Sequence, residues 1–146
     1  MQGVHDAVQD ELNEVRKLDE LINAKLAERS QLWDMVTHIT PNMDGMPHGT
    51  DVTDKVGNIA AKLADLARET DALVDKYVDK RQRIITMLET LPAEEYGVMH
   101  RHYIQFISWN KIAREMNYSR MQVFRIKQKA LRRLQSSYTM LHSDVL

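Results

Sequence analysis

Two long segments, in each of which apolar residues recur every three or four positions, limit what this chain can fold into. Residues 4–37 contain neither Gly nor Pro, and a second stripe follows at 54–90. Between them, residues 40–51 hold two of the three Pro and two of the five Gly of the chain. Apolar residues at this spacing share one face of a helix, and Pro with Gly marks a loop. The sequence therefore predicts an all-α chain that begins with a long antiparallel helical hairpin, 4–38 against 54–89.

In each segment the apolar residues form a stripe along one face of the helix, and their spacing is typical of a coiled-coil seam. The first stripe consists of Val4, Val8, Leu12, Val15, Leu18, Ile22, Leu26, Trp33 and Val36. The second consists of Ile59, Leu63, Leu66, Thr70, Leu73, Tyr77, Lys80, Ile84, Met87 and Leu91, with Thr70 and Lys80 as polar interruptions. Asp51, Thr53 or Asp54 is expected to cap the second helix. Because each stripe covers only one face, we expect the hairpin domain (1–90) to bind a partner, most simply a second copy in a homodimer.

Charge is distributed unevenly along the chain. Residues 1–99 carry 11 Lys/Arg and 19 Asp/Glu, a net charge of −8, whereas residues 100–146 carry 9 Lys/Arg and 2 acids, a net charge of +7. An acidic body joined to a basic end is typical of a protein in which one part approaches a polyanion.

The basic end falls in a segment, 91–134, that predicts three short helices. Pro92 is expected at the first helical position, with Glu94 and Glu95 in the first turn, where carboxylates suit the helix dipole. Ser108 is expected to cap a second helix, and Asn117 to adopt the left-handed conformation of a tight turn.

The third of these helices is expected to begin at Ser119, which forms a capping box with Gln122. Its buried stripe is Val123, Ile126, Ala130 and Leu134, with Leu131 at the edge. The opposite face carries Met121, Arg125, Gln128 and Arg132, flanked by Gln122 and Lys129. Residues 118–134 include six basic residues and no acid. A short helix, a tight turn and a cationic amphipathic helix together indicate a helix-turn-helix that reads duplex DNA in the major groove.

The same segment resembles region 4 of bacterial sigma-70-type factors, which reads the −35 promoter element. The similarity lies in W-x-x-I-A-x-x-x-x-Y-S-R-x-x-V-x-x-I-x-x-K-A-L-x-x-L, residues 109–134. The resemblance implies base-reading roles for Arg120, Met121 and Arg125. Met121 departs from the family, which usually has an acidic residue there, so the promoter specificity does not transfer.

The loop region carries a second resemblance. P-N-M-D-G-M-P-H-G, followed by T-D-K-V-G-N-I-A-A-K-L-A-D-L, is similar to the segment between long helices in ArpU/RinA-like transcriptional regulators of phages and prophages. The resemblance implies an activator of late genes that acts with host RNA polymerase in the cytoplasm of the host cell.

These interpretations assign residues to two kinds of DNA contact in the C-terminal domain (91–146). Base edges are expected to be read by Arg120, Met121, Gln122 and Arg125. Phosphates are expected to be bound by Ser108, Lys111, Arg114, Ser119, Lys127, Gln128, Lys129, Arg132 and Arg133. The expected partners are double-stranded DNA, host RNA polymerase and a second copy of the chain.

Two other functions remain open from the sequence. One is a small terminase-like DNA-packaging subunit, and the other is a region-4 mimic that binds polymerase without DNA. An enzyme is not expected, because no phosphate-binding loop, nucleophile elbow or paired carboxylates occur. His100 and His102 diverge on a helix and cysteine is absent, so neither a metal nor another cofactor is expected. No apolar run approaches the roughly 18 residues of a membrane span, which predicts a cytoplasmic protein with no membrane partner.

Overall fold

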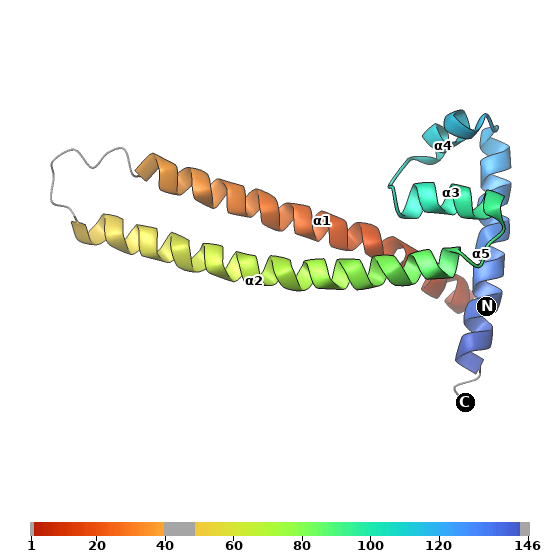
Figure 1. Ribbon diagram of the computed structural model, residues 1–146, viewed down its shortest axis with the longest axis horizontal. Helices are drawn as coiled ribbons and strands as arrows, with labels where there is room; N and C mark the ends of the chain where they lie inside the picture. The colour runs from red at the N-terminus through yellow and green to blue at the C-terminus, as the bar shows by residue number, and fades with distance from the viewer. Residues whose placement is uncertain (1, 40–48, 144–146) are drawn as a thin grey trace. The chain divides into compact units, whose positions relative to one another are not determined.

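The computed structural model describes residues 2–39 and 49–143, and the side chains of 7–38 and 53–138. The described residues form helices without strands (Figure 1). The helices are α1 (Gln2–Ile39), α2 (Gly49–Leu88), α3 (Ala93–Tyr103), α4 (Trp109–Met116) and α5 (Arg120–Ser143). The predicted fold class is confirmed: a pair of long helices is followed by shorter helices.

The chain divides into two compact units, and the division does not fall at residue 90, the domain boundary expected from the sequence. One unit, here called the core unit, consists of the described residues up to Lys17 and from Tyr77 onward. The other, the two-helix unit, consists of 18–39 and 49–76. The beginning of α1 and the end of α2 therefore belong with the short helices, because they share one hydrophobic core with them.

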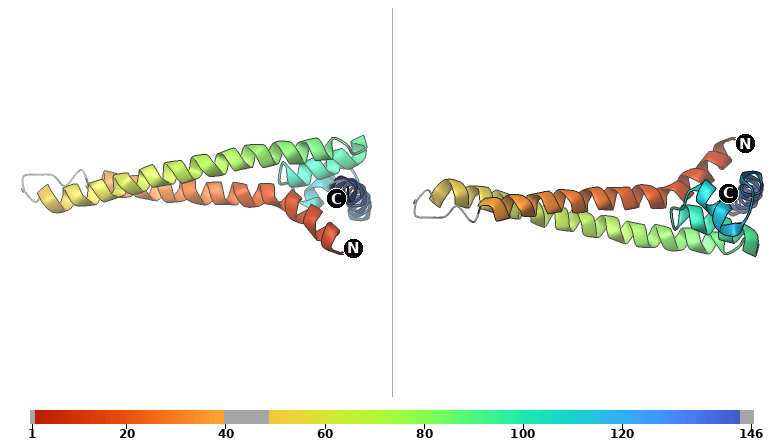
Figure 2. Two further views of the ribbon diagram at one scale, coloured as in Figure 1. Left: turned by 90° about the horizontal axis from the view of Figure 1, so that it is seen from below. Right: turned by 90° about the horizontal axis from the view of Figure 1, so that it is seen from above.

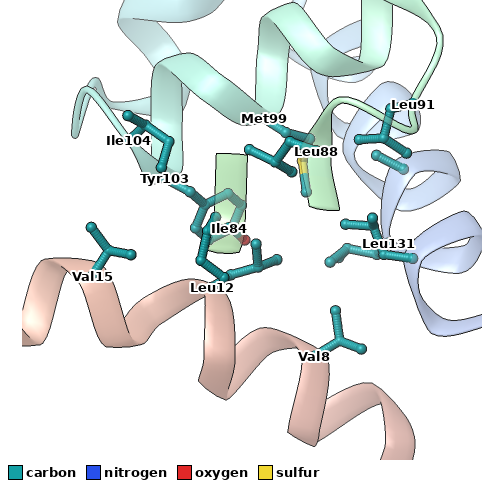
Figure 3. Packing of buried hydrophobic residues seen from close by; sticks show 12 residues of the cluster. Val8, Leu12, Val15, Ile84, Leu88, Leu91, Met99, Tyr103, Ile104 and Leu131 are labelled. Carbon is teal, nitrogen blue, oxygen red and sulfur yellow. The ribbon is translucent and has the colours of Figure 1, made fainter. Parts of the chain in front are cut away.

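That shared core is built from four helices (Figure 3). Val8, Leu12 and Val15 of α1 point toward Ile84 and Leu88 of α2, and Met99, Tyr103 and Leu131 of α3 and α5 close the cluster. Lys80, an interruption of the second stripe, is half-buried, and its Nζ lies 3.2 Å from Oε1 of Glu11 on α1. The polar position in the stripe is thus paired with a carboxylate of the neighbouring helix.

In the two-helix unit, the α1 and α2 segments lie side by side and run in opposite directions (Figure 2). Leu18, Ile59 and Leu66 are buried, and every residue of the predicted α2 stripe is at least half-buried. In α1, however, Leu26 and Trp33 are 43% and 50% exposed, so their assignment to the packed stripe was wrong.

The helical period explains this difference. At about 100° per residue, Leu26 lies about 80° around the helix from Leu18, whereas Lys25 lies only about 20° away. The Nζ of Lys25 reaches Oε2 of Glu69 at 2.7 Å, and Leu32 is half-buried at the position expected for Trp33.

Two predicted helix starts were also wrong. α2 begins at Gly49, so Asp51, Thr53 and Asp54 lie inside the helix instead of capping it. Acidic residues favour the first turn as well as the cap, which makes this boundary ambiguous in sequence. Pro92 is the N-cap of α3 with an extended ψ of 154°, and its carbonyl accepts from the backbone N–H of Tyr96 at 2.8 Å. Residues 40–48 of the predicted loop lie outside the described residues.

Candidate nucleic-acid interface

α4 and α5 are joined by a tight turn, as the sequence predicted. Oγ of Ser108 accepts from the backbone N–H of Lys111 at 3.3 Å, which caps α4. Asn117 ends α4 in the left-handed conformation, with φ of 56° and ψ of 41°. The backbone N–H of Tyr118 then donates to the carbonyl of Ala113 at 2.9 Å. These bonds satisfy backbone groups that a helix end leaves unpaired, and they define the direction in which α5 leaves.

The capping box at the start of α5 is also confirmed. Oγ of Ser119 accepts from the N–H of Gln122 at 3.1 Å, and the N–H of Ser119 donates to Oε1 of Gln122 at 2.8 Å. Both side chains are therefore used to begin the helix. The cap occupies one of the two acceptor sites of Gln122 Oε1, so the second lone pair and the amide N–H₂ remain for another partner.

A small hydrophobic cluster holds α4 and α5 against α3. Its buried members are Val98, Ile112, Ala113, Val123 and Ile126. The buried stripe predicted for α5 is confirmed, and Leu131, expected at its edge, is fully buried. The apolar side of α5 is thus turned to the protein, and the opposite side is left to solvent.

The exposed side of α5 is cationic and, across its described side chains, free of acids. Met121 is 65% exposed, and Gln122, Arg125, Lys129 and Arg132 are exposed as well, while Gln128 is half-buried. Among the described residues, no carboxylate pairs with Arg125, Lys129 or Arg132. This arrangement presents several unneutralised cations over consecutive turns of one helix.

Arg120 and Lys127, which flank this side, both contact α4. The Nε of Arg120 donates to Oδ1 of Asn110 at 2.8 Å, although the arginine itself is exposed. The Nζ of Lys127 lies 4.9 Å from the ring centroid of Trp109, a cation–π distance. Each contact orients a cation without neutralising it.

Arg133 has a different environment from the other predicted phosphate ligands. Its Nε lies 3.2 Å from Oε1 and 3.0 Å from Oε2 of Glu95, a residue of α3 that is only 5% exposed. The Arg133 side chain remains 60% exposed. Since a buried carboxylate is costly without a counter-charge, the structure gives Arg133 a role in neutralising Glu95 that the sequence pattern did not reveal.

The predicted phosphate ligands of α4 are exposed, and one of them faces an acid. The Nζ of Lys111 lies 4.0 Å from Oε1 of Glu115, and the Nε of Arg101 lies 3.9 Å from its Oε2. Arg114 is exposed on the same helix. Exposed pairs at these distances are weak, so the cations of α4 remain available to another anion.

Phe124 is a surface residue that the sequence analysis missed. It is 56% exposed, and it lines a groove of about 390 Å³ together with Ser108, Trp109, Asn110, Arg120, Val123 and Lys127. The helical period places Phe124 about 40° from Arg120, so the spacing contained this information. It was overlooked because the exposed side was defined by its charges.

His102 packs against Trp109, one of the residues that line this groove. Its ring stacks on Trp109 with centroids 3.7 Å apart, and its Nδ1–H donates to the carbonyl of Ile107 at 2.8 Å. Burial lowers the pKa of His102; the Ile107 carbonyl acts in the opposite direction, and Lys127 and Arg16 lower the pKa further. Burial and the charges of Arg81 and Arg101 lower the pKa of His100. Both shifts favour the neutral form of the imidazole ring.

Within the described ranges, no three His, Asp or Glu side chains lie close enough together to bind a metal ion. None of the described helices is both long and apolar enough to cross a membrane.

No protein-family model matches the sequence, and comparisons with curated proteins and with solved structures produced no match.

Proposed function

We propose that this chain binds duplex DNA in a sequence-specific manner through α5 and regulates transcription in a phage or prophage. The observation that carries the proposal is the arrangement of α4, the left-handed Asn117 and the capped α5, whose exposed side is cationic and acid-free. A helix of this kind, supported by a preceding short helix, is the element that helix-turn-helix proteins insert into the major groove. The resemblance to sigma region 4 supports the same assignment.

In this proposal the first turns of α5 read base edges. Arg120 and Arg125 are exposed near the N-terminus of the helix, and arginine binds O6 and N7 of guanine in a bidentate manner. Met121 offers an apolar contact, and Gln122 contributes its amide N–H₂ group and the Oε1 lone pair that the cap leaves unused.

The remaining cations bind the DNA backbone. Lys127, Lys129 and Arg132 lie on α5, and Lys111 and Arg114 lie on α4. Ser108, Ser119 and Gln128 complete the proposed phosphate contacts through their hydroxyl and amide donors. Arg133, which pairs with Glu95, is assigned a smaller share of this binding than the sequence predicted.

The decisive experiment selects bound duplexes from a random pool and compares Arg125→Ala with Lys129→Ala on the winning sequence. Removal of a base-reading arginine should cost about 1–3 kcal/mol and relax the preference at one position, whereas removal of a phosphate-binding lysine should weaken all sequences alike. Equal losses on the selected and on random duplexes for both variants would contradict the assigned roles. A chain that retards no duplex would favour the polymerase-binding mimic instead.

We propose further that the chain activates late genes together with host RNA polymerase. The ArpU/RinA-like resemblance supports this proposal. The test is transcription by the host enzyme from a template that carries the selected sequence beside a promoter. An activator increases the transcript in proportion to occupancy of its site. A decrease would show repression and contradict the proposed sign of regulation.

We also propose a homodimer, supported by apolar side chains that the two-helix unit exposes. The exposed residues are Leu21, Leu26, Trp33, Met35 and Val74. A second copy would remove them from water, with a gain that grows with the apolar area covered. The mass in solution tests this: a dimer agrees with a regulator, a monomer contradicts the dimer, and a large ring favours the DNA-packaging alternative.

A further inference from the structure

Two of the large apolar side chains on the surface of the core unit stand together at the start of α5. Among the described residues of that unit, the exposed large hydrophobic side chains are Val78, Met121 and Phe124. Met121 and Phe124 lie on successive turns of the helix proposed to enter the major groove. Single exposed apolar residues are ordinary, but this pair lies within the proposed DNA-reading surface.

Around the helix, the pair lies between the two proposed base-reading arginines. At about 100° per residue, Arg120, Phe124, Met121 and Arg125 follow one another at about 0°, 40°, 100° and 140° around the helix. Along the axis these four residues span about 7.5 Å, at about 1.5 Å per residue. Such a length faces two to three neighbouring base pairs, so one short stretch of DNA meets two guanidinium groups and two apolar side chains.

The neighbouring contacts leave the apolar pair uncovered. Arg120 contacts Asn110 and Lys127 lies over Trp109, while Phe124 and Met121 remain 56% and 65% exposed. The groove beside Phe124 passes between the beginning of α4 and the beginning of α5. The ring and the Met121 thioether are therefore available to a ligand that approaches α5 from solvent.

We propose that Met121 and Phe124 bind the C5-methyl groups of thymines, and that the recognised sequence places thymines directly beside guanine. Thymine is the base that presents a methyl group in the major groove, and apolar side chains contact it, while arginine binds guanine. The inference rests on the proposed function, because it describes how the same helix distinguishes sequences.

The test replaces each thymine of the selected duplex in turn by deoxyuridine, which removes the methyl group and keeps Watson–Crick pairing. Binding should weaken about fourfold at each contacted position, the factor expected for one buried methyl group. Fluorescence anisotropy at fixed salt measures the change.

Variants then assign the effect to the two side chains. Met121→Ala and Phe124→Ala should bind the thymine duplex more weakly, and each should lose the response to deoxyuridine at one position. Lys129→Ala is the matched control, because it should weaken binding to both duplexes and keep the full response. Circular dichroism should show unchanged helix content, since both apolar side chains are exposed.

The failures of the two proposals are distinguishable. Sequence-specific binding that is equal on thymine and deoxyuridine duplexes at every position would overturn this inference and leave the proposed function intact. A response that persists in both alanine variants would also overturn it. Absence of binding to any duplex would overturn the proposed function and the inference together.

Discussion

Arg133 binds the Glu95 carboxylate, although the cations beside it in the chain are proposed to bind phosphate. Arg133 follows Arg132 in the chain, and both were predicted to bind phosphate. Yet Arg132 is exposed without a described partner, whereas Arg133 reaches a buried carboxylate on α3. One step along a helix turns a side chain by about 100°, which separates these two environments.

The first prediction follows from this pair. Arg133→Ala should lower the free energy of unfolding by about 1–3 kcal/mol, because it leaves the Glu95 carboxylate buried without a counter-charge. Arg132→Ala is the matched control and should change stability by less than about 0.5 kcal/mol. Urea denaturation measures both. Equal effects of the two substitutions would show that the pair contributes nothing to stability.

Asn117 carries the second prediction at this scale. Its φ of 56° is costly for most side chains by about 1–2 kcal/mol, while glycine adopts it freely. Asn117→Ala should therefore destabilise the protein by about 1 kcal/mol, and Asn117→Gly should leave stability nearly unchanged. Thermal unfolding of the three proteins checks this, and a Gly variant as unstable as the Ala variant would contradict it.

The histidines of α3 predict a dependence of stability on pH. The pKa of His102 is lowered from its ordinary value of 6.5, so the unfolded chain takes up a proton more readily than the folded one. Stability should be full above about pH 6.5 and should decrease as pH falls from there through the lower pKa of the folded state. His100 acts in the same direction.

The measurement is denaturation between about pH 7.5 and pH 5 for the native chain and for His102→Asn. Asparagine cannot be protonated but can donate to the Ile107 carbonyl as the imidazole Nδ1–H does, so the variant should show a shallower loss of stability. An identical pH profile for both proteins would exclude His102 as a source of the dependence.

At the scale of elements, helix starts and stops followed local chemistry wherever a cap was present. α4 and α5 begin directly after Ser108 and Ser119, each of which caps the helix through its hydroxyl. α2 begins before the cap residues expected from the sequence, and α3 begins one residue after Pro92. The reliable boundaries were those where a side chain satisfies a specific backbone donor.

Gly57 offers a prediction about α2. It lies inside the helix, and apart from its chain neighbours and the helix's own backbone, no atom lies within 4 Å of the place a Cβ would occupy. Gly57→Ala should therefore stabilise the protein by about 0.5–1 kcal/mol through the higher helix propensity of alanine. The midpoint of urea unfolding should rise. A fall in the midpoint would indicate that this position is covered in the folded protein, for example by a second copy.

At the scale of the whole molecule, the uneven distribution of charge predicts that DNA binding depends on salt concentration. The net charge is −8 over residues 1–99 and +7 over residues 100–146. If Lys111, Arg114, Lys127, Lys129 and Arg132 each neutralise one phosphate, the slope of log K against log salt should be about −4.5 per copy.

The slope is tested with one variant and one control. Arg132→Ala should make the slope less negative by about 1, because one phosphate contact is lost, whereas Gln128→Ala should leave the slope unchanged. Anisotropy titrations from low to moderate salt measure it. A slope near zero for the native chain would contradict binding through phosphate contacts.

The sequence by itself determined the all-helical class, the α2 stripe, the turn at Asn117 and the capping box at Ser119. These features depend on residues within a few positions of one another, so a single stretch of chain contains all the chemistry that decides them.

Tertiary structure alone decided three other features. The ends of the long hairpin share a core with the short helices, α1 packs through Lys25 and Leu32 instead of Leu26 and Trp33, and Arg133 pairs with Glu95. Each depends on groups far apart in the chain: Glu95 and Arg133, for example, are 38 residues apart. Local periodicity identifies which residues can be buried, but the partner helix determines which of them are.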